Sequence, residues 1–361
     1  MSGALDRWMF EEYRTPAASL AVCRILYAAC ILGIYLPQHL WIARFPDSFL
    51  NPPYGFTIFF AGFPPAAYFV ALNVLAVFAG VGLLVGYRTR ACAVGLALLL
   101  LAGNAWAYSF GKINNDILLV VIPLVLQFSG WGDAYSLDAR RGRPVDPSRN
   151  AWPLALLALV VGCAMLTGAQ PKAASGWLDP HTHAVRGHLL RNAYVVGRMN
   201  PLAALMLRVQ SGAFWEAFDD ATVLLEGALV FAVVRRGAFR TVCALACLFH
   251  LGIALTMEIA YWPNPLAYAA FCDWSVLGSR PWARRAAALW ETGLVRLGAG
   301  GAALVAAAIA VVYLTLGNPL EQLILRLGGR PELVLGLGVC APAAAVAVVF
   351  LVRPSRAAPR A

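Results

Sequence analysis

Charged side chains are scarce in this chain. Of its 361 residues, 13% are Asp, Glu, Lys or Arg, whereas 61% are hydrophobic, and the mean hydropathy is +0.70. Soluble domains usually carry about 25% charged residues, so this composition excludes an ordinary soluble protein. We expect an all-α fold, a polytopic transmembrane helical bundle.

Lysine is nearly absent: only Lys112 and Lys172 stand among the 28 basic residues. A net charge of +10 would suggest nucleic acid as the partner of a soluble protein. Here the arginines lie mostly in short connecting loops, where basic residues act as topology signals. We therefore expect membrane lipid, and no nucleic acid, as a partner.

Several functional motifs are missing as well. The eight cysteines form no C-x-x-C pair and lie mostly in apolar runs, which excludes a disulfide scaffold and argues against zinc or iron–sulfur sites. Glycine-rich nucleotide loops, serine nucleophile elbows and H-E-x-x-H are absent. The first 15 residues carry both charge signs and no apolar core, so we expect no removable signal peptide.

Ten stretches approach the roughly 20 apolar residues that a helix needs to cross a membrane. They lie at 17–37, 66–86, 91–110, 114–130, 152–170, 218–234, 241–260, 264–278, 299–317 and 333–352. The eighth is short and follows Trp262-Pro263-Asn264-Pro265, where two prolines favour a turn, so it is either re-entrant or tilted.

Loop charges give the expected orientation. With a cytoplasmic N-terminus, 18 of the 28 basic residues fall in cytoplasmic segments. Such an excess is typical of inside loops, so we expect about ten spans, both termini inside, and an inner (cytoplasmic) membrane location. The predicted parts are a cytoplasmic N-terminus at 1–16, a membrane domain at 17–280, and a two-span C-terminal appendage with a short tail at 281–361.

Five ionisable side chains lie inside or at the margins of these spans: Arg24, Asp116, Glu226, His250 and Glu258. A charge at bilayer depth costs a few kcal/mol and persists mostly where it pairs, lines a wet cavity or reacts. Glu226 lies in the middle of the sixth span, and Arg24 is its obvious partner inside the membrane. We predict a structural ion pair between them, which fixes the fold.

Lys172 follows the fifth span on its outer side, in T-G-A-Q-P-K-A-A-S-G-W. Lysine can lose its proton when desolvated, whereas arginine stays charged. A neutral amine can act as a general base, which makes Lys172 a catalytic candidate. The alternative is a lysine at a helix end that snorkels to the lipid headgroups.

Asn114, Asn115 and Asp116 open the fourth span. They are candidates for holding a polar ligand by hydrogen bonds, and the alternative is a helix N-cap. His250 lies mid-span in the seventh helix, and Glu258 lies at its outer end. A neutral imidazole can donate to a carbonyl and accept from a hydroxyl, so His250 is a second catalytic candidate; the alternative is a packed structural histidine.

The loop at 171–217 holds three histidines, His181, His183 and His188, close to Asp179. Alternate histidines point the same way only on a strand, and no strand pattern is present. The spacing also lacks a second tight pair of ligands. We therefore expect no metal and interpret them as ordinary loop histidines.

A series of short motifs follows in order along residues 20–280: Cys23-Arg24-Ile25-Leu26, Gly86-Tyr87-Arg88-Thr89-Arg90, Asn114-Asn115-Asp116, Gly132-Asp133-Ala134-Tyr135-Ser136-Leu137-Asp138, Gly168, Lys172, Trp177 and His250. In this order and spacing, the chain resembles the horizontally transferred transmembrane (HTTM) domain family, which is related to the vitamin K-dependent gamma-carboxylases.

The resemblance implies a lysine base that deprotonates a reduced quinone, and Lys172 would be its counterpart here. The carboxylases also carry a large extramembrane C-terminal region, where this chain has two further spans. Our first hypothesis is a quinol-dependent oxidoreductase or carboxylase-like enzyme with an outward-facing pocket of Asp116, Lys172, His250 and Glu258, acting with a vitamin K-like quinone on a small-molecule or peptide substrate. The alternative is a non-enzymatic transporter or membrane assembly partner.

Overall fold

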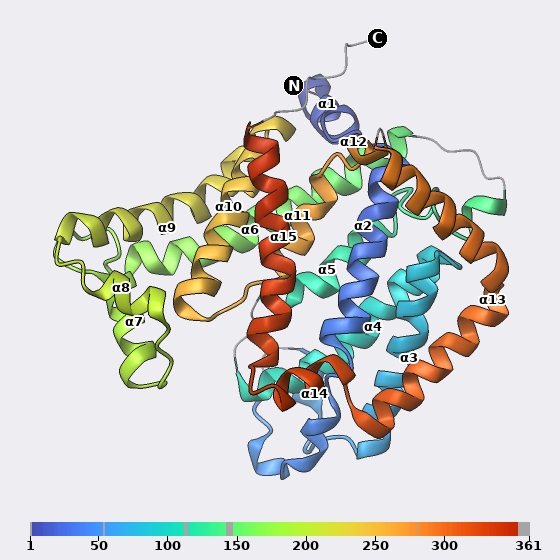
Figure 1. The fold of residues 1–361 in the computed structure, drawn as a ribbon, viewed down its shortest axis with the longest axis horizontal. Helices are drawn as coiled ribbons and strands as arrows, with labels where there is room; N and C mark the ends of the chain where they lie inside the picture. Colours follow the sequence, from blue (N-terminus) through green and yellow to red (C-terminus); the bar gives the residue numbers. More distant parts are fainter. Residues whose placement is uncertain (1, 53–54, 112–114, 142–146, 279, 353–361) are drawn as a thin grey trace. The chain divides into compact units, whose positions relative to one another are not determined.

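A computed structural model describes residues 2–52, 55–111, 115–141, 147–278 and 280–352 (Figure 1). Helices make up the regular structure of these residues, and short π-helical and 3₁₀ turns connect several of them. The α-helices are α1 (Ser2–Arg7), α2 (Ala17–Cys30), α3 (Ala66–Val85), α4 (Thr89–Ala107), α5 (Ile117–Leu126), α6 (Ala151–Ala174), α7 (Ala184–Tyr194), α8 (Pro201–Leu207), α9 (Gly212–Ala232), α10 (Arg236–Met257), α11 (Pro263–Tyr268), α12 (Ser275–Gly278), α13 (Pro281–Leu316), α14 (Pro319–Arg326) and α15 (Pro331–Val352).

Seven helical stretches of the described residues are long and apolar enough to cross a membrane, which confirms a polytopic, all-helical membrane protein. They are Ala17–Arg44, Ala66–Val85, Thr89–Phe110, Ala151–Ala174, Arg236–Met257, Pro281–Arg326 and Pro331–Leu351. The predicted ninth span, 299–317, lies within α13, whose helical path is interrupted just before it at Gly298, with φ of 56°. Glycine adopts such positive φ values readily.

Three predicted spans differ from the structure. α5 has only ten residues, and α9 has 21 but holds Glu216, Asp219, Asp220 and Glu226, so neither is among the seven. Residues 264–278 do not form the single helix that we predicted. The chain turns between α11 and α12, where the Asp273 carboxylate accepts hydrogen bonds from the backbone N–H and hydroxyl of Ser275. Such a local bond competes with helix continuation.

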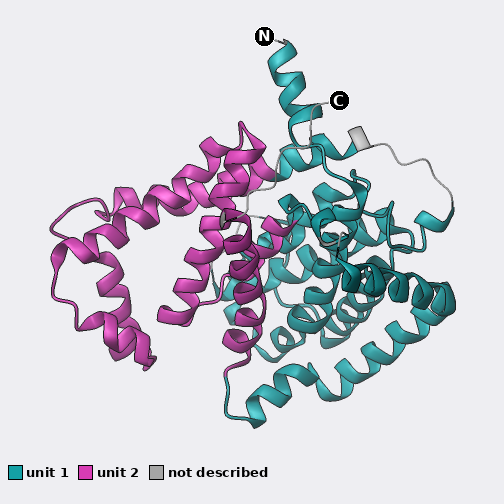
Figure 2. Cartoon of the chain, turned by 45° about the horizontal axis from the view of Figure 1, so that its top comes forward, with its two compact units in different colours: residues 1–157, 270–329 teal, residues 158–269, 330–361 magenta. Residues whose placement is uncertain are grey.

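The described chain divides into two compact units (Figure 2). Unit 1 comprises residues 1–157 and 270–329, and unit 2 comprises residues 158–269 and 330–361. In unit 1, α3 packs against α2, α4 and α13, and α4 packs against α5. In unit 2, α10 packs against α9 and α15. Residues 281–329 of the predicted appendage therefore belong to unit 1, whereas α15 belongs to unit 2.

Arg24, on α2, has no exposed surface and is held entirely by backbone carbonyls of unit 1. Its guanidinium donates to the carbonyl oxygens of Leu83, Leu84, Trp131, Ala134 and Tyr135, at distances from 2.5 to 3.4 Å. A guanidinium has five N–H donors, so these five bonds use its full capacity. The predicted Arg24–Glu226 ion pair is wrong, because carbonyl oxygens satisfy Arg24 and Glu226 has another partner.

The carbonyls that bind Arg24 lie in or just before two of the segments that carry the family resemblance, Gly86–Arg90 and Gly132–Asp138. Gly86 ends α3 with φ of 67°, and a Cβ there would lie 2.2 Å from that of Ser136. Asp138 accepts hydrogen bonds from the backbone N–H groups of Arg88 and Thr89 at the start of α4. Arg24, the α3–α4 turn and residues 131–138 therefore form one hydrogen-bonded structural hub in unit 1.

In unit 2, small residues let α6 approach α9 closely. A Cβ at Gly162 would lie 2.9 Å from the Cα atom of Val230, which is backbone and cannot rotate away. Residues without bulky side chains permit such close helix contacts in membrane proteins. This contact holds in place the part of α6 that continues to Lys172.

We expect Gly162→Ala to lower the thermal unfolding midpoint of the detergent-purified protein, because the added methyl group forces α6 and α9 apart at a cost of roughly 1–3 kcal/mol. Gly227→Ala is the matched control, since a Cβ there meets nothing within 4 Å. Equal midpoints for the two variants would contradict the close packing of α6 on α9.

Candidate functional site: a lysine–glutamate pair beside a buried histidine

Lys172 and Glu226 form an ion pair in unit 2. The Nζ atom of Lys172, in the last turn of α6, lies 2.5 Å from both carboxylate oxygens of Glu226, which is on α9. The Glu226 side chain is 10% exposed and that of Lys172 is 27% exposed. Glu226 is thus neutralised by the lysine that the sequence singles out, and Lys172 does not simply extend to the surface.

Two neighbours shape this pair. A Cβ at Gly168 would lie 3.2 Å from a carboxylate oxygen of Glu226, so glycine leaves room for the carboxylate beside α6. On the other side, the Lys172 ammonium lies 5.4 Å from the ring centroid of Trp177. Such cation–π contacts favour a positive charge over an aromatic face. Gly168, which contacts Glu226, and Trp177, which contacts Lys172, are both part of the resemblance and flank the ion pair.

His250, on α10, is buried at 3% exposure within unit 2. Its Nε2 atom lies 3.2 Å from the hydroxyl of Tyr268 and 3.3 Å from the Nδ2 atom of Asn264, both on α11. The Tyr261 ring lies 5.8 Å from the imidazole, between centroids. The Trp-Pro-Asn-Pro turn thus brings polar side chains of α11 against α10. We expected His250 from the sequence but not Asn264, Tyr261 or Tyr268.

Two atoms of this histidine cluster lack partners among the described residues. They are Nδ1 of His250 and Oδ1 of Asn264, and both are buried. Buried polar atoms are normally hydrogen-bonded, so such exceptions often mark a place where water or a ligand binds. The charges of the ion pair also act here, since Lys172 interacts electrostatically with His250, and Glu226 with Tyr261 and Tyr268.

Glu258 has a different environment from the one we predicted. It ends α10 with φ of 57° and forms an ion pair with Arg330, next to α15. Its Oε1 atom also lies 3.3 Å from the Nδ2 atom of Asn200. These contacts fix the end of α10 and give the carboxylate a cationic partner, and the described residues show no hydrogen bond or ion pair between Glu258 and either Lys172 or His250. A role in orienting a ligand is not needed to explain this residue.

The candidates at the fourth span belong to unit 1, apart from Asn114, which lies outside the described residues. Asn115 precedes α5, and Asp116 is at the N-cap position of α5 but makes no side-chain capping bond. Its carboxylate instead interacts electrostatically with the hydroxyl groups of Tyr35 and Tyr108. A place for Asp116 beside Lys172 stays a prediction.

Unit 1 holds a polar cluster of its own, which we did not predict. Asn104, on α4, accepts a hydrogen bond from the hydroxyl of Tyr35 at 2.8 Å, and its Oδ1 atom lies 2.7 Å from Nε2 of His39. A Cβ at Gly103 would overlap the His39 ring. The only sequence signals were an asparagine inside an apolar run and a glycine beside it.

The three histidines that we interpreted as loop residues have separate surroundings in unit 2, and His188 is on α7 rather than in a loop. His188 lies over the Trp177 ring, with centroids 5.5 Å apart. Desolvation lowers the pKa of His188, and the positive charges of Arg191 and Lys172 lower it further, against an opposing effect of Asp219. Asp179 accepts a hydrogen bond from the backbone N–H of His181. His183 lies beside two carboxylates of α9, Glu216 and Asp219, which we did not predict as its neighbours.

A hollow of about 590 Å³ opens in unit 1. Residues between 135 and 140 line it together with residues between 288 and 296 of α13, including Arg140, Glu291 and Arg296. None of the predicted site residues lines this hollow. The ion pair and the buried unpaired polar atoms of the histidine cluster belong to unit 2, so we place the candidate site at Lys172, Glu226 and His250.

The fold and these residues define a polytopic membrane protein with ionisable side chains buried among its helices. Comparison with protein families then gives the relationship: the HTTM domain model matches residues 13–272, more than half of the chain. The chain therefore belongs to the HTTM domain family, as its sequence predicted. No curated protein and no solved structure matches it.

Proposed function

We propose that this protein is a membrane enzyme that accepts a proton from a reduced quinone, with Lys172 as the base. The observation that carries the proposal is the Lys172–Glu226 ion pair, in the same unit as a buried histidine cluster that has two unpaired polar atoms. Membrane interiors disfavour unpaired ionisable groups, and those that persist usually bind or react. The resemblance to the gamma-carboxylases implies the same chemistry.

Lys172 and Glu226 together hold one proton that can move between the amine and the carboxylate. When the carboxylate holds it, the amine is neutral and can take the hydroxyl proton of a bound quinol. The product is the quinolate anion beside the resulting ammonium. Glu226 therefore has a chemical role, as the proton store of the base, as well as a structural one.

The histidine cluster would hold the quinol. Nδ1 of His250 can accept from, or donate to, a quinol oxygen, depending on the tautomer. The Oδ1 atom of Asn264 can accept a hydroxyl proton in a hydrogen bond. The Tyr261 and Tyr268 rings next to the imidazole would suit a quinone ring, since small-molecule sites combine apolar and aromatic walls with a few placed polar groups.

In the proposed topology the protein lies in the inner (cytoplasmic) membrane, has about ten spans, and has both termini in the cytoplasm. The positive-inside distribution of the arginines supports it. In this orientation the last turn of α6, which holds Lys172, lies on the outer side. A quinol dissolved in the membrane would reach the site from the lipid, and the second substrate, a small molecule or peptide, would approach from outside.

The test uses the full-length protein purified in detergent. We expect extracted protein to retain a quinone that is detectable by ultraviolet absorbance, and added naphthoquinol to support oxygen consumption. Replacing His250 with phenylalanine should reduce quinone retention by roughly tenfold or more, because the ligand loses a buried hydrogen bond. His181→Ala, in the exposed loop, is the control. Protein that binds no quinone and consumes no oxygen with quinol would overturn the proposal.

A further inference from the structure

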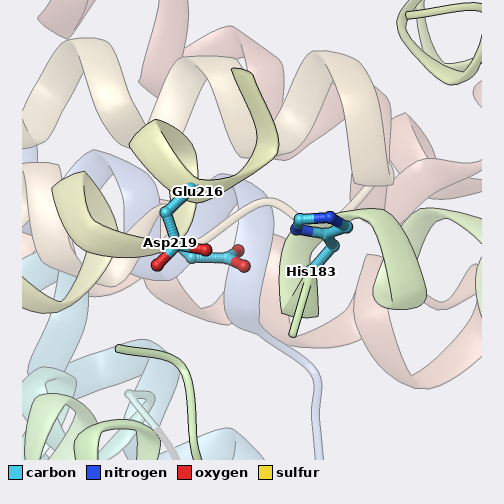
Figure 3. Close-up of side chains that lie close together, drawn as sticks. All are labelled: His183, Glu216 and Asp219. Atoms are coloured by element: carbon cyan, nitrogen blue, oxygen red, sulfur yellow. The ribbon is translucent and has the colours of Figure 1, made fainter. Parts of the chain in front are cut away.

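A second group of ionisable side chains lies at the junction of α7 and α9, within unit 2 (Figure 3). Glu216 and Asp219 are three residues apart on α9, a spacing that puts both side chains on one face of a helix. His183 immediately precedes α7 and faces these carboxylates. One ligand atom from each of the three residues lies within 4.8 Å of the others.

Asp219 explains how these elements meet. It has no exposed surface, and its two carboxylate oxygens each accept a backbone N–H bond at 2.7 Å, from Ala184 and Val185. It thus caps the first turn of α7 from a neighbouring helix. Each carboxylate oxygen has two lone pairs, so both oxygens keep one for a further partner.

Capping does not explain the other two residues. Oε2 of Glu216 and Nδ1 of His183 are buried and have no hydrogen-bond partner among the described residues. Among the described residues, no lysine or arginine forms an ion pair with Glu216 or Asp219. Two adjacent carboxylates without a basic partner repel each other, and a cation between them would remove this cost.

We propose that His183, Glu216 and Asp219 bind a divalent transition-metal ion of the zinc class. One imidazole nitrogen and two carboxylate oxygens suit zinc, whereas magnesium and calcium prefer oxygen ligands alone. Tetrahedral zinc with bonds of about 2.0 Å holds its ligand atoms about 3.3 Å apart, so small side-chain rotations would close the site. The fourth position would hold water.

The ion would tie the start of α7 to α9, next to the cap made by Asp219. The sequence alone does not predict this site, because His183 is there grouped with other loop histidines, and its carboxylate partners lie more than 30 residues further along the chain. This site shares no residue with the Lys172–Glu226 pair. Metal binding here therefore does not depend on the proposed quinone chemistry.

The experiment measures metal binding to full-length protein that carries no histidine tag and has been stripped with a chelator. We expect one Zn²⁺ per chain by elemental analysis after dialysis, and Co²⁺ should give the visible absorption of a four-coordinate site. Mg²⁺ in large excess should not displace either ion. Bound zinc should also raise the thermal unfolding midpoint.

Glu216→Gln keeps the size of the side chain but removes its charge, and we expect it to weaken Zn²⁺ binding at least about tenfold, as even the loss of indirect metal contacts does. His183→Ala should do the same. Asp220→Asn, beside the site, is the matched control and should bind like the parent. The unfolding midpoints of the metal-free variants show whether they are folded. Stoichiometric binding that survives both Glu216→Gln and His183→Ala, or a parent protein that binds no Zn²⁺ or Co²⁺, would overturn the proposal.

Discussion

Replacing Arg24 with lysine should nearly abolish folded protein in the membrane. Arg24 makes five hydrogen bonds to backbone carbonyls and has no exposed surface. Lysine has three donors on a single nitrogen, so at least two carbonyls would lose their bonds. Hydrogen bonds to charged groups contribute about 1.5–3 kcal/mol each, so the loss is about 3–6 kcal/mol. That is a large share of the usual 5–15 kcal/mol stability of a domain.

The matched control is Arg90→Lys, since Arg90 is an exposed arginine at the start of α4 whose guanidinium lies over the Phe128 ring. Membrane abundance and the elution profile in size-exclusion chromatography provide the measurement. We expect Arg90→Lys to behave like the parent and Arg24→Lys to aggregate or be degraded. Parent-like abundance and stability for Arg24→Lys would show that the carbonyl contacts do not hold the structural hub together.

Arg24 also shows why a buried charge cannot be paired from sequence alone. We matched it with Glu226 because both lie in apolar spans and have opposite signs. Its actual partners are carbonyls of Leu83 and Leu84 at the end of α3 and of residues 131–135, which form a turn. Hydropathy identifies helices well because every helix crossing the hydrocarbon needs a long apolar stretch. It contains no information about which carbonyls remain free at a turn.

The partner of Lys172 could have been found from helical geometry. α6 continues to Ala174, beyond our predicted end at residue 170, so Lys172 is part of the helix. Side chains on a helix point back towards its N-terminus, which directs the lysine stem towards Gly168, four residues earlier on the same face. A glycine at that position marks a place where another group approaches, and this group is Glu226.

The polar partners of His250 were harder to predict. Asn264 and Tyr268 are four residues apart and share a face of α11, yet the prolines at 263 and 265 indicated a break in the chain rather than a polar helix face beside His250. The sequence shows that a turn is present but not where it directs the next helix. A buried polar cluster built across a turn therefore becomes visible only in three dimensions.

Lys172→Arg should separate the chemistry from the structure at the candidate site. Arginine keeps the positive charge, can bind the Glu226 carboxylate with two parallel hydrogen bonds, and can lie over the Trp177 ring. Membrane abundance and thermal stability should therefore stay close to those of the parent. Arginine does not deprotonate in proteins, so quinol-dependent oxygen consumption should fall by roughly 10²–10⁴-fold, the usual contribution of a general base.

Glu226→Gln provides the complementary result. It leaves the Lys172 ammonium without its partner and removes the carboxylate that would store the proton, so we expect both stability and turnover to decrease. The double variant Lys172→Met with Glu226→Gln carries neither charge and should recover much of the stability, because replacing a buried ion pair by neutral groups is often tolerated. It should remain inactive. If Lys172→Arg retains full turnover while the double variant is stable, the pair serves only to hold α6 and α9 together, and the base must be sought elsewhere.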